Sequence, residues 1–147
     1  MGVAVVLLAL GACSSPSSAP TSTTASGSTS KAPANGLVQS HSGGNVTIEV
    51  KWMGSPDGSA LAFEVVMDTH SVDLDQYDLG KLAVLRDDTG KEYSPAAWQS
   101  APGGHHRTGT LSFPAPEGLA QGKVRSIQLV IRQVAGVAER VLEWQLG

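Results

Sequence analysis

The sequence has little of several features, and each shortage excludes a class of protein. Its 147 residues include one cysteine, seven aromatic residues and 16% charged residues, with a formal net charge of −3. A single cysteine leaves no partner for a disulfide within the chain. The slightly acidic balance offers no surplus of positive charge for neutralising phosphates, which excludes a basic nucleic-acid binder. No apolar run approaches the roughly 20 residues that a membrane-spanning helix needs.

The residues that are present divide the chain into three parts. Residues 1–13 are almost wholly apolar, and 12 of the 22 residues in 14–35 are Ser or Thr. All seven aromatic residues and 22 of the 23 charged residues follow position 35. A Ser/Thr/Pro segment without apolar periodicity cannot bury enough surface to fold. We therefore expect a signal peptide at 1–12, an acylated cysteine with a flexible linker at 13–35, and one folded domain at 36–147.

The N-terminal residues carry the most specific motif. Residues 3–10 form an eight-residue apolar run, the length of the apolar region of a signal peptide. The run ends in Leu10-Gly11-Ala12-Cys13, which resembles the bacterial lipobox. This resemblance implies cleavage before Cys13, acylation of its sulfur, and lipid anchoring of the mature chain on the extracytoplasmic face of the cell membrane. Two or three acyl chains give stable anchoring where one does not.

The folded part has the two-residue period of β-strands. Apolar and polar residues alternate without error over 46–52, and the apolar residues of 61–67 also fall on one face. Residues 81–86 are apolar on both faces, which is typical of a central strand, whereas 95–104 is expected to be irregular. Residues 71–80 are expected to hold a helical turn, with Ser71 or Asp73 as its cap.

Turn residues separate these short runs, and no helical crossovers lie between them. The pattern predicts an all-β fold, an antiparallel immunoglobulin-like β-sandwich of about seven strands. Trp52, Trp98 and Trp144 are candidates for its core, and Trp98 is equally suited to line a pocket.

Two segments concentrate the residues that are able to carry chemistry. Residues 68–78 hold four carboxylates and one histidine, and residues 103–109 read Gly-Gly-His-His-Arg-Thr-Gly. Both lie at strand ends, and the loops of a sandwich cluster at its two ends, so we expect that the two segments can meet. The candidate metal ligands are His70, His105, His106 and Asp73, and the candidate ligand-contacting residues are Asp75, Asp78, Arg107 and Trp98.

Three interpretations of these segments are open. Imidazole with carboxylate suits copper or zinc, although adjacent histidines in an extended segment point to opposite sides. A calcium site would use Asp73, Asp75 and Asp78, but the glycine of an EF-hand loop is absent. In the structural interpretation, Asp and Ser cap local N–H groups, Gly103-Gly104 forms a turn, and the basic side chains pair with nearby carboxylates.

Catalysis is not expected. The sequence has no Gly-x-Ser-x-Gly elbow, no glycine-rich phosphate loop and no zinc-protease motif. A domain of this size also leaves little room for a substrate cleft. The chain is therefore expected not to be an enzyme.

A resemblance covers residues 45–146. The segments 63–74, 85–90 and 104–114 are similar to uncharacterised bacterial extracytoplasmic domains, which implies a secreted or lipid-anchored β domain and no transferable activity. The expected function is thus a non-enzymatic binding or structural lipoprotein with no required cofactor. Its expected partners are the membrane and an envelope protein or polymer, with no nucleic acid. The alternative is a copper- or zinc-binding lipoprotein that uses His70 and His105/His106.

Overall fold

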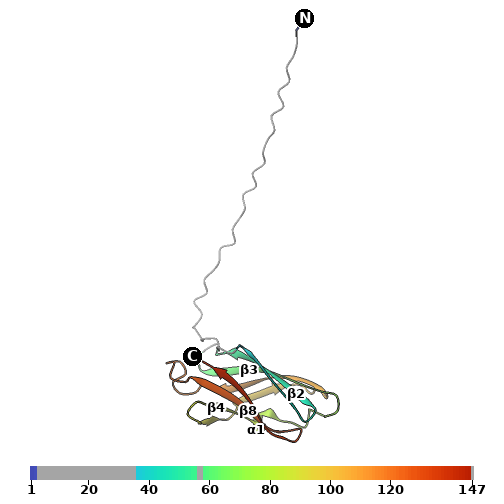
Figure 1. Ribbon diagram of the computed structural model, residues 1–147, viewed down its shortest axis with the longest axis vertical. Coiled ribbons are helices and arrows are strands. Elements are labelled where there is room, and N and C mark those ends of the chain that lie inside the picture. Colours follow the sequence, from blue (N-terminus) through green and yellow to red (C-terminus); the bar gives the residue numbers. More distant parts are fainter. Residues whose placement is uncertain (3–35, 56–57, 147) are drawn as a thin grey trace.

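Nine β-strands and one short helix follow Gly36 in the computed structural model, which describes residues 1–2, 36–55 and 58–146 (Figure 1). The predicted signal-peptide run, Cys13 and the linker lie outside the described residues. The elements are β1 (Val38–Gly43), β2 (Val46–Gly54), β3 (Ala60–Thr69), α1 (Leu79–Leu82), β4 (Ala83–Asp87), β5 (Glu92–Tyr93), β6 (Ala97–Ser100), β7 (His106–Pro114), β8 (Ser126–Val134) and β9 (Val137–Gln145).

The strands form two antiparallel sheets that face each other. One sheet has the order β1-β2-β3-β7-β6 and the other the order β5-β4-β8-β9. Without β1, these are the strand orders of an immunoglobulin-like sandwich, in which four strands face a three-strand sheet extended by one edge strand. The predicted antiparallel sandwich is confirmed, with nine strands where the sequence pattern indicated about seven.

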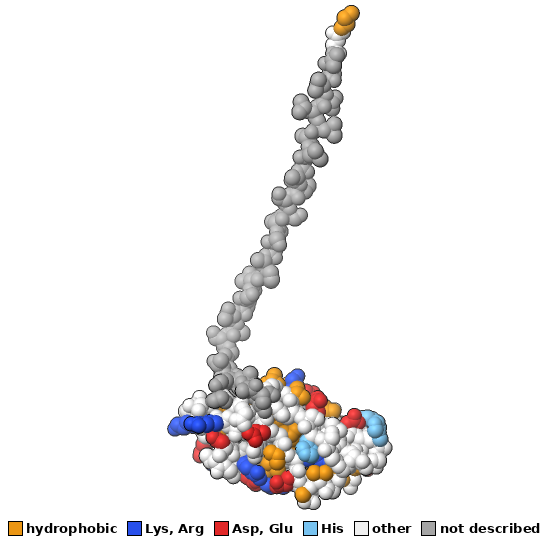
Figure 2. Space-filling model, in the orientation of Figure 1, with side chains coloured by type: hydrophobic (Ala, Val, Ile, Leu, Met, Phe, Trp, Pro, Cys, Tyr) orange, Lys and Arg blue, Asp and Glu red, His pale blue; other side chains and the backbone are white. Residues whose placement is uncertain are grey.

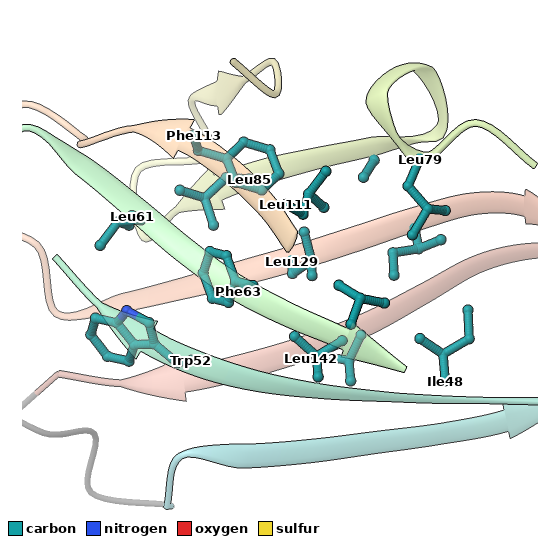
Figure 3. Close-up of a cluster of buried hydrophobic side chains, with 14 of the residues drawn as sticks. Ile48, Trp52, Leu61, Phe63, Leu79, Leu85, Leu111, Phe113, Leu129 and Leu142 are labelled. Atoms are coloured by element: carbon teal, nitrogen blue, oxygen red, sulfur yellow. The ribbon is translucent and has the colours of Figure 1, made fainter. Parts of the chain in front are cut away.

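The alternation seen in the sequence builds the core. Inward-facing residues of β2 and β3 are fully or almost fully buried, and Phe63 lies at the centre of the apolar cluster (Figure 3). Its ring centroid is 5.2 Å from that of Trp144 and 5.9 Å from that of Phe113. Trp52 and Trp144 are buried as predicted, whereas Trp98 is only partly buried at the edge of the cluster.

The turn between β4 and β5 is built around one buried carboxylate. Asp87 Oδ1 accepts hydrogen bonds from the backbone and hydroxyl of Thr89 and from the backbone of Lys91, and Oδ2 accepts one from the Tyr93 hydroxyl. Burial alone raises the pKa of Asp87, but these hydrogen bonds outweigh it and hold the pKa below its ordinary value. The folded state therefore stabilises the ionised form.

The helical turn expected within residues 71–80 lies later in the chain. Helix α1 spans four residues and is capped by Asp78, whose side chain accepts a hydrogen bond from the backbone of Gly80 at 3.0 Å. Ser71 and Asp73 precede it and are not its cap. Among the described residues, no helix is long and apolar enough to cross a membrane.

Candidate functional site

The two segments that the sequence singled out lie side by side at one end of the sandwich. The backbone N–H of Thr69 donates to the His105 carbonyl at 3.0 Å, and that of Leu74 donates to the Gly104 carbonyl at 2.8 Å. Residues 70–78 follow β3, residues 101–105 precede β7, and β3 and β7 are neighbours in the first sheet. We call residues 68–78 and 103–107 the loop pair.

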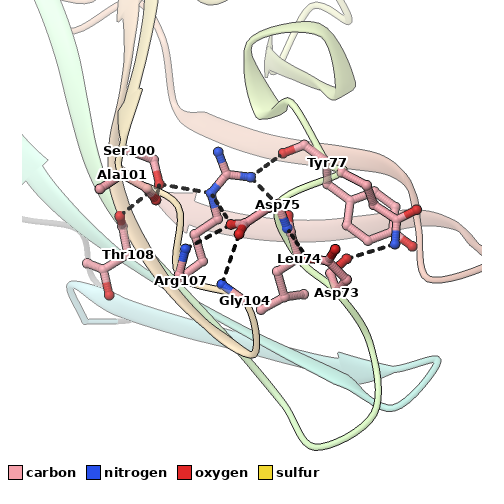
Figure 4. A network of polar contacts seen from close by, with 11 residues as sticks. Asp73, Leu74, Asp75, Tyr77, Ser100, Ala101, Gly104, Arg107 and Thr108 are labelled. Carbon is pink, nitrogen blue, oxygen red and sulfur yellow. Dashed lines mark hydrogen bonds and ion pairs between the residues drawn. The ribbon is translucent and has the colours of Figure 1, made fainter.

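Asp75 joins the two halves of the loop pair. Its carboxylate accepts hydrogen bonds from the backbone N–H groups of Gly103, at 2.8 Å, and Gly104, at 3.1 Å (Figure 4). The bond from Gly103 is the main reason that the pKa of Asp75 lies below its ordinary value, and Gly104 and Arg107 act in the same direction. Asp75 thus has a structural role in holding the glycine turn.

Glycine is required at this turn for two different reasons. A β-carbon on Gly103 would lie 2.2 Å from the carbonyl oxygen of His106, so any side chain there forces the backbone apart. Gly104 has a φ of 59°, in the left-handed region that favours glycine. The predicted Gly103-Gly104 turn is present, and it places the next three residues.

Arg107 ties the loop pair to the body of the sandwich. Its guanidinium donates to the carbonyls of Leu74, at 2.9 Å, and Tyr77, at 2.8 Å (Figure 4). The Nε group donates to the Ser100 hydroxyl at 3.0 Å. The side chain is only 10% exposed and lies over the Trp98 ring, 5.6 Å from its centroid. The sequence marked Arg107 and Trp98 as candidate ligand-contacting residues. In the structure they pack on the inner side of the two loops and support them.

The histidines and remaining carboxylates form the exposed surface of the loop pair. His70, His105, Asp73 and Asp78 are exposed, and Asp78 caps α1 and pairs with Lys81 at 3.1 Å. His106 Nδ1 lies 2.7 Å from a carboxylate oxygen of Asp68, with both side chains more than half exposed.

The described part of the chain contains no group of three or more His, Cys, Asp or Glu side chains placed to hold a metal ion. The sequence segments meet as expected, but His70, His105, His106 and Asp73 do not assemble into such a group. A close contact of 2.7 Å links Asp68 with His106 instead, and an ion pair of 3.8 Å links Asp75 with Arg107.

Two contributors were not named as candidate site residues from the sequence. Asp68, near the end of β3, pairs with His106, and Ser100, at the end of β6, pairs with Gly109, so the role of each becomes visible only once the strand register is known. The sequence held one signal for Asp68: it continues the alternation of residues 61–67 at a position that faces solvent. Nothing in the sequence distinguishes Ser100 from its neighbours.

The loop pair lies at the opposite end of the sandwich from the point where the chain enters the fold. The register places Thr47, Asp68 and His106 in one row across the sheet, beside the β1–β2 turn. The start of β1 is at the other end, where the Leu37 carbonyl accepts hydrogen bonds from Trp52 and Trp144. In Figure 2, pale-blue histidine side chains lie at the right-hand end of the domain with an acidic side chain beside them.

No protein-family model, curated protein or solved structure matches the chain.

Proposed function

We propose that this chain is an extracytoplasmic lipoprotein, anchored in the cell membrane through lipid on Cys13, whose sandwich presents the loop pair as a non-enzymatic binding surface. The sequence supports the anchor, because its only cysteine follows an apolar run in a lipobox-like motif. The observation that supports the loop pair as the presented surface is its placement at the end of the sandwich opposite Leu37.

This placement suits a tethered receptor. Strand β1 alone takes the chain about 17 Å from the entry end toward the loop end, at about 3.3 Å per residue. A domain held by its entry end therefore has the loop pair at the end farther from its point of attachment. The loop pair is also rigidly supported, because its inner groups are hydrogen-bonded while its histidines remain exposed. Preorganised loops lose less conformational freedom on binding.

The anchor is tested by expressing the full chain in a bacterial host with labelled palmitate. We expect label in the chain, a larger precursor in the presence of globomycin, and loss of both effects in Cys13→Ser. An unlabelled chain of unchanged size would contradict the lipoprotein assignment.

The test of the binding surface uses an introduced cysteine, because the sequence has no second cysteine of its own. Acylation leaves no free thiol, so a cysteine introduced as His105→Cys carries a maleimide photo-crosslinker at one position only. Met53→Cys is the matched control, because Met53 is 51% exposed and lies near the entry end. We expect covalent adducts with an envelope component from position 105 and none from position 53. Equal adducts from both positions, or none from position 105, would contradict the role of the loop pair.

A further inference from the structure

Strand β1 is an addition to the sandwich and contributes nothing to its core. No residue of β1 is buried, and none belongs to the apolar cluster, whose members lie between Val46 and Leu146. The residues on the inward face are Gln39, His41 and Gly43, opposite the buried Val50, Ile48 and Val46. Glycine and small polar residues are weak strand formers. Side-chain packing therefore contributes little to keeping β1 on the domain.

The closed position also carries a polar cost. Nδ1 of His41 is buried and has no hydrogen-bond partner among the described residues. A buried polar atom without a partner costs the free energy of its lost hydration. Movement of β1 away from the sandwich would return that atom to water.

Two backbone carbonyls, one in β1 and one in the residue before it, accept hydrogen bonds from side chains of β9. The Leu37 carbonyl accepts from Trp144 Nε1 at 3.2 Å, and the Gly43 carbonyl accepts from Arg140 Nη2 at 2.6 Å. Every extended chain presents such carbonyls, so these contacts recognise a strand and not a particular side chain. Arg140 and Trp144 are both fully buried, so a site vacated by β1 needs another strand to replace those acceptors.

The register of the β1–β2 hairpin favours one replacement above others. Each residue i of β1 pairs with residue 89 − i of β2, without a bulge, from Val38↔Lys51 to Gly43↔Val46. If the turn straightens, residues 38–51 of two copies form one continuous antiparallel ribbon with a two-fold axis between positions 44 and 45. Every pairing of the closed hairpin is kept in this ribbon, and closed two-fold symmetry makes the association self-limiting.

We propose that β1 is an exchangeable strand, and that two copies of this chain associate by each placing its β1 on the β2 edge of the other. The hinge is the two-residue turn, in which Gly44 and Asn45 have φ values of 59° and 61°. Straightening this turn returns Asn45 from the left-handed region to the extended region that non-glycine residues prefer. The exchange does not depend on the lipid anchor.

Cysteine pairs report directly which β1 lies on which β2. In the full chain carrying Cys13→Ser, we introduce Ser42→Cys and Thr47→Cys, whose native hydroxyl oxygens are 2.8 Å apart. A closed chain forms the disulfide within itself, and an exchanged pair forms it between copies. Gln128→Cys with Glu143→Cys is the matched control, because these paired residues of β8 and β9 lie on a hairpin that does not exchange.

We expect disulfides between copies to increase several-fold as the protein concentration is raised during oxidation, for the 42/47 pair and not for the 128/143 pair. Asn45→Pro forbids the left-handed turn and should raise the exchanged fraction, whereas Asn45→Gly should lower it. Far-ultraviolet circular dichroism verifies that each variant is folded.

Two results would overturn the proposal. One is a 42/47 disulfide that forms only within single chains at all concentrations, in the folded Asn45→Pro variant as well. The other is a dimer in sedimentation whose 42/47 disulfides are all within chains, since such a dimer uses another surface.

Discussion

Replacement of Arg107 by methionine should loosen the loop pair and destabilise the whole domain. Methionine keeps apolar contact with the Trp98 ring but removes the hydrogen bonds to Leu74, Tyr77 and Ser100. The Leu74 carbonyl keeps one long bond from the Tyr77 N–H, at 3.2 Å, whereas the Tyr77 carbonyl loses the one donor shown for it in the described structure. Asp75 also loses its cationic neighbour, 3.8 Å away.

The size of the effect follows from these contacts. An unsatisfied buried carbonyl costs about 1–3 kcal/mol, and each hydrogen bond from a charged donor contributes about 1.5–3 kcal/mol. Because the site is partly exposed and the losses overlap, we expect the free energy of unfolding to fall by about 3 kcal/mol. That is a large share of the roughly 5–15 kcal/mol typical of a domain.

Urea denaturation followed by tryptophan fluorescence measures this loss. With a slope of about 1–2 kcal/mol per molar urea, the midpoint of Arg107→Met should fall by about 1.5–3 M. Arg132→Met is the matched control, since Arg132 is 34% exposed and its ion pairs with Glu92 and Glu139 lie on the surface. We expect it to cost less than about 1 kcal/mol. Equal losses for the two variants would refute the supporting role of Arg107.

Two further substitutions test the packing and the electrostatics of the fold. In Gly109→Ala, the new β-carbon would lie 2.5 Å from the Trp98 ring, so we expect the free energy of unfolding measured with urea to fall by about 2–3 kcal/mol. Gly43→Ala is the control: its new β-carbon would lie 3.1 Å from a side-chain methyl, and it should cost less than about 1 kcal/mol. Equal costs for the two variants would refute this packing argument. The lowered pKa of Asp87 stabilises the fold above the unfolded-state pKa near 4, and this contribution is lost as the pH falls through the folded-state pKa. The urea midpoint of Asp87→Asn should therefore change less between pH 5 and about 2.5 than that of the unmodified chain, and parallel pH profiles would count against the role of Asp87.

The strands that cover the core were predictable, because their alternation directly reflects burial on one face. Residues 46–52 fall within β2, and the run 81–86, with apolar residues on both faces, overlaps β4, an interior strand of its sheet, while its first two residues belong to α1. Strands β1 and β6 were missed, since neither contributes a fully buried residue and each is held at a sheet edge. Arg140 shares the phase of Leu142 and Trp144, but a charged residue at a buried position is visible only in the structure.

The loop pair was predictable as a meeting of two segments but not in its internal roles. The glycines and acidic residues indicated a tight polar junction, and the sandwich topology brings the two strand ends together. Which residues support the junction and which are exposed depends on register and burial. Arg107 was expected to contact a ligand, and in the structure it lies beneath the loops with its side chain 10% exposed.

The intact mass of the mature protein extracted from bacterial membranes tests the proposed anchoring most directly. Lipid anchoring predicts a chain that begins at Cys13 and carries the additional mass of a diacylglyceryl thioether, with or without a further acyl group on its amine. Treatment with a lipoprotein lipase should remove the ester-linked acyl chains and release the protein from the membrane. A mature chain that begins elsewhere, or one with an unmodified Cys13, would contradict the proposal.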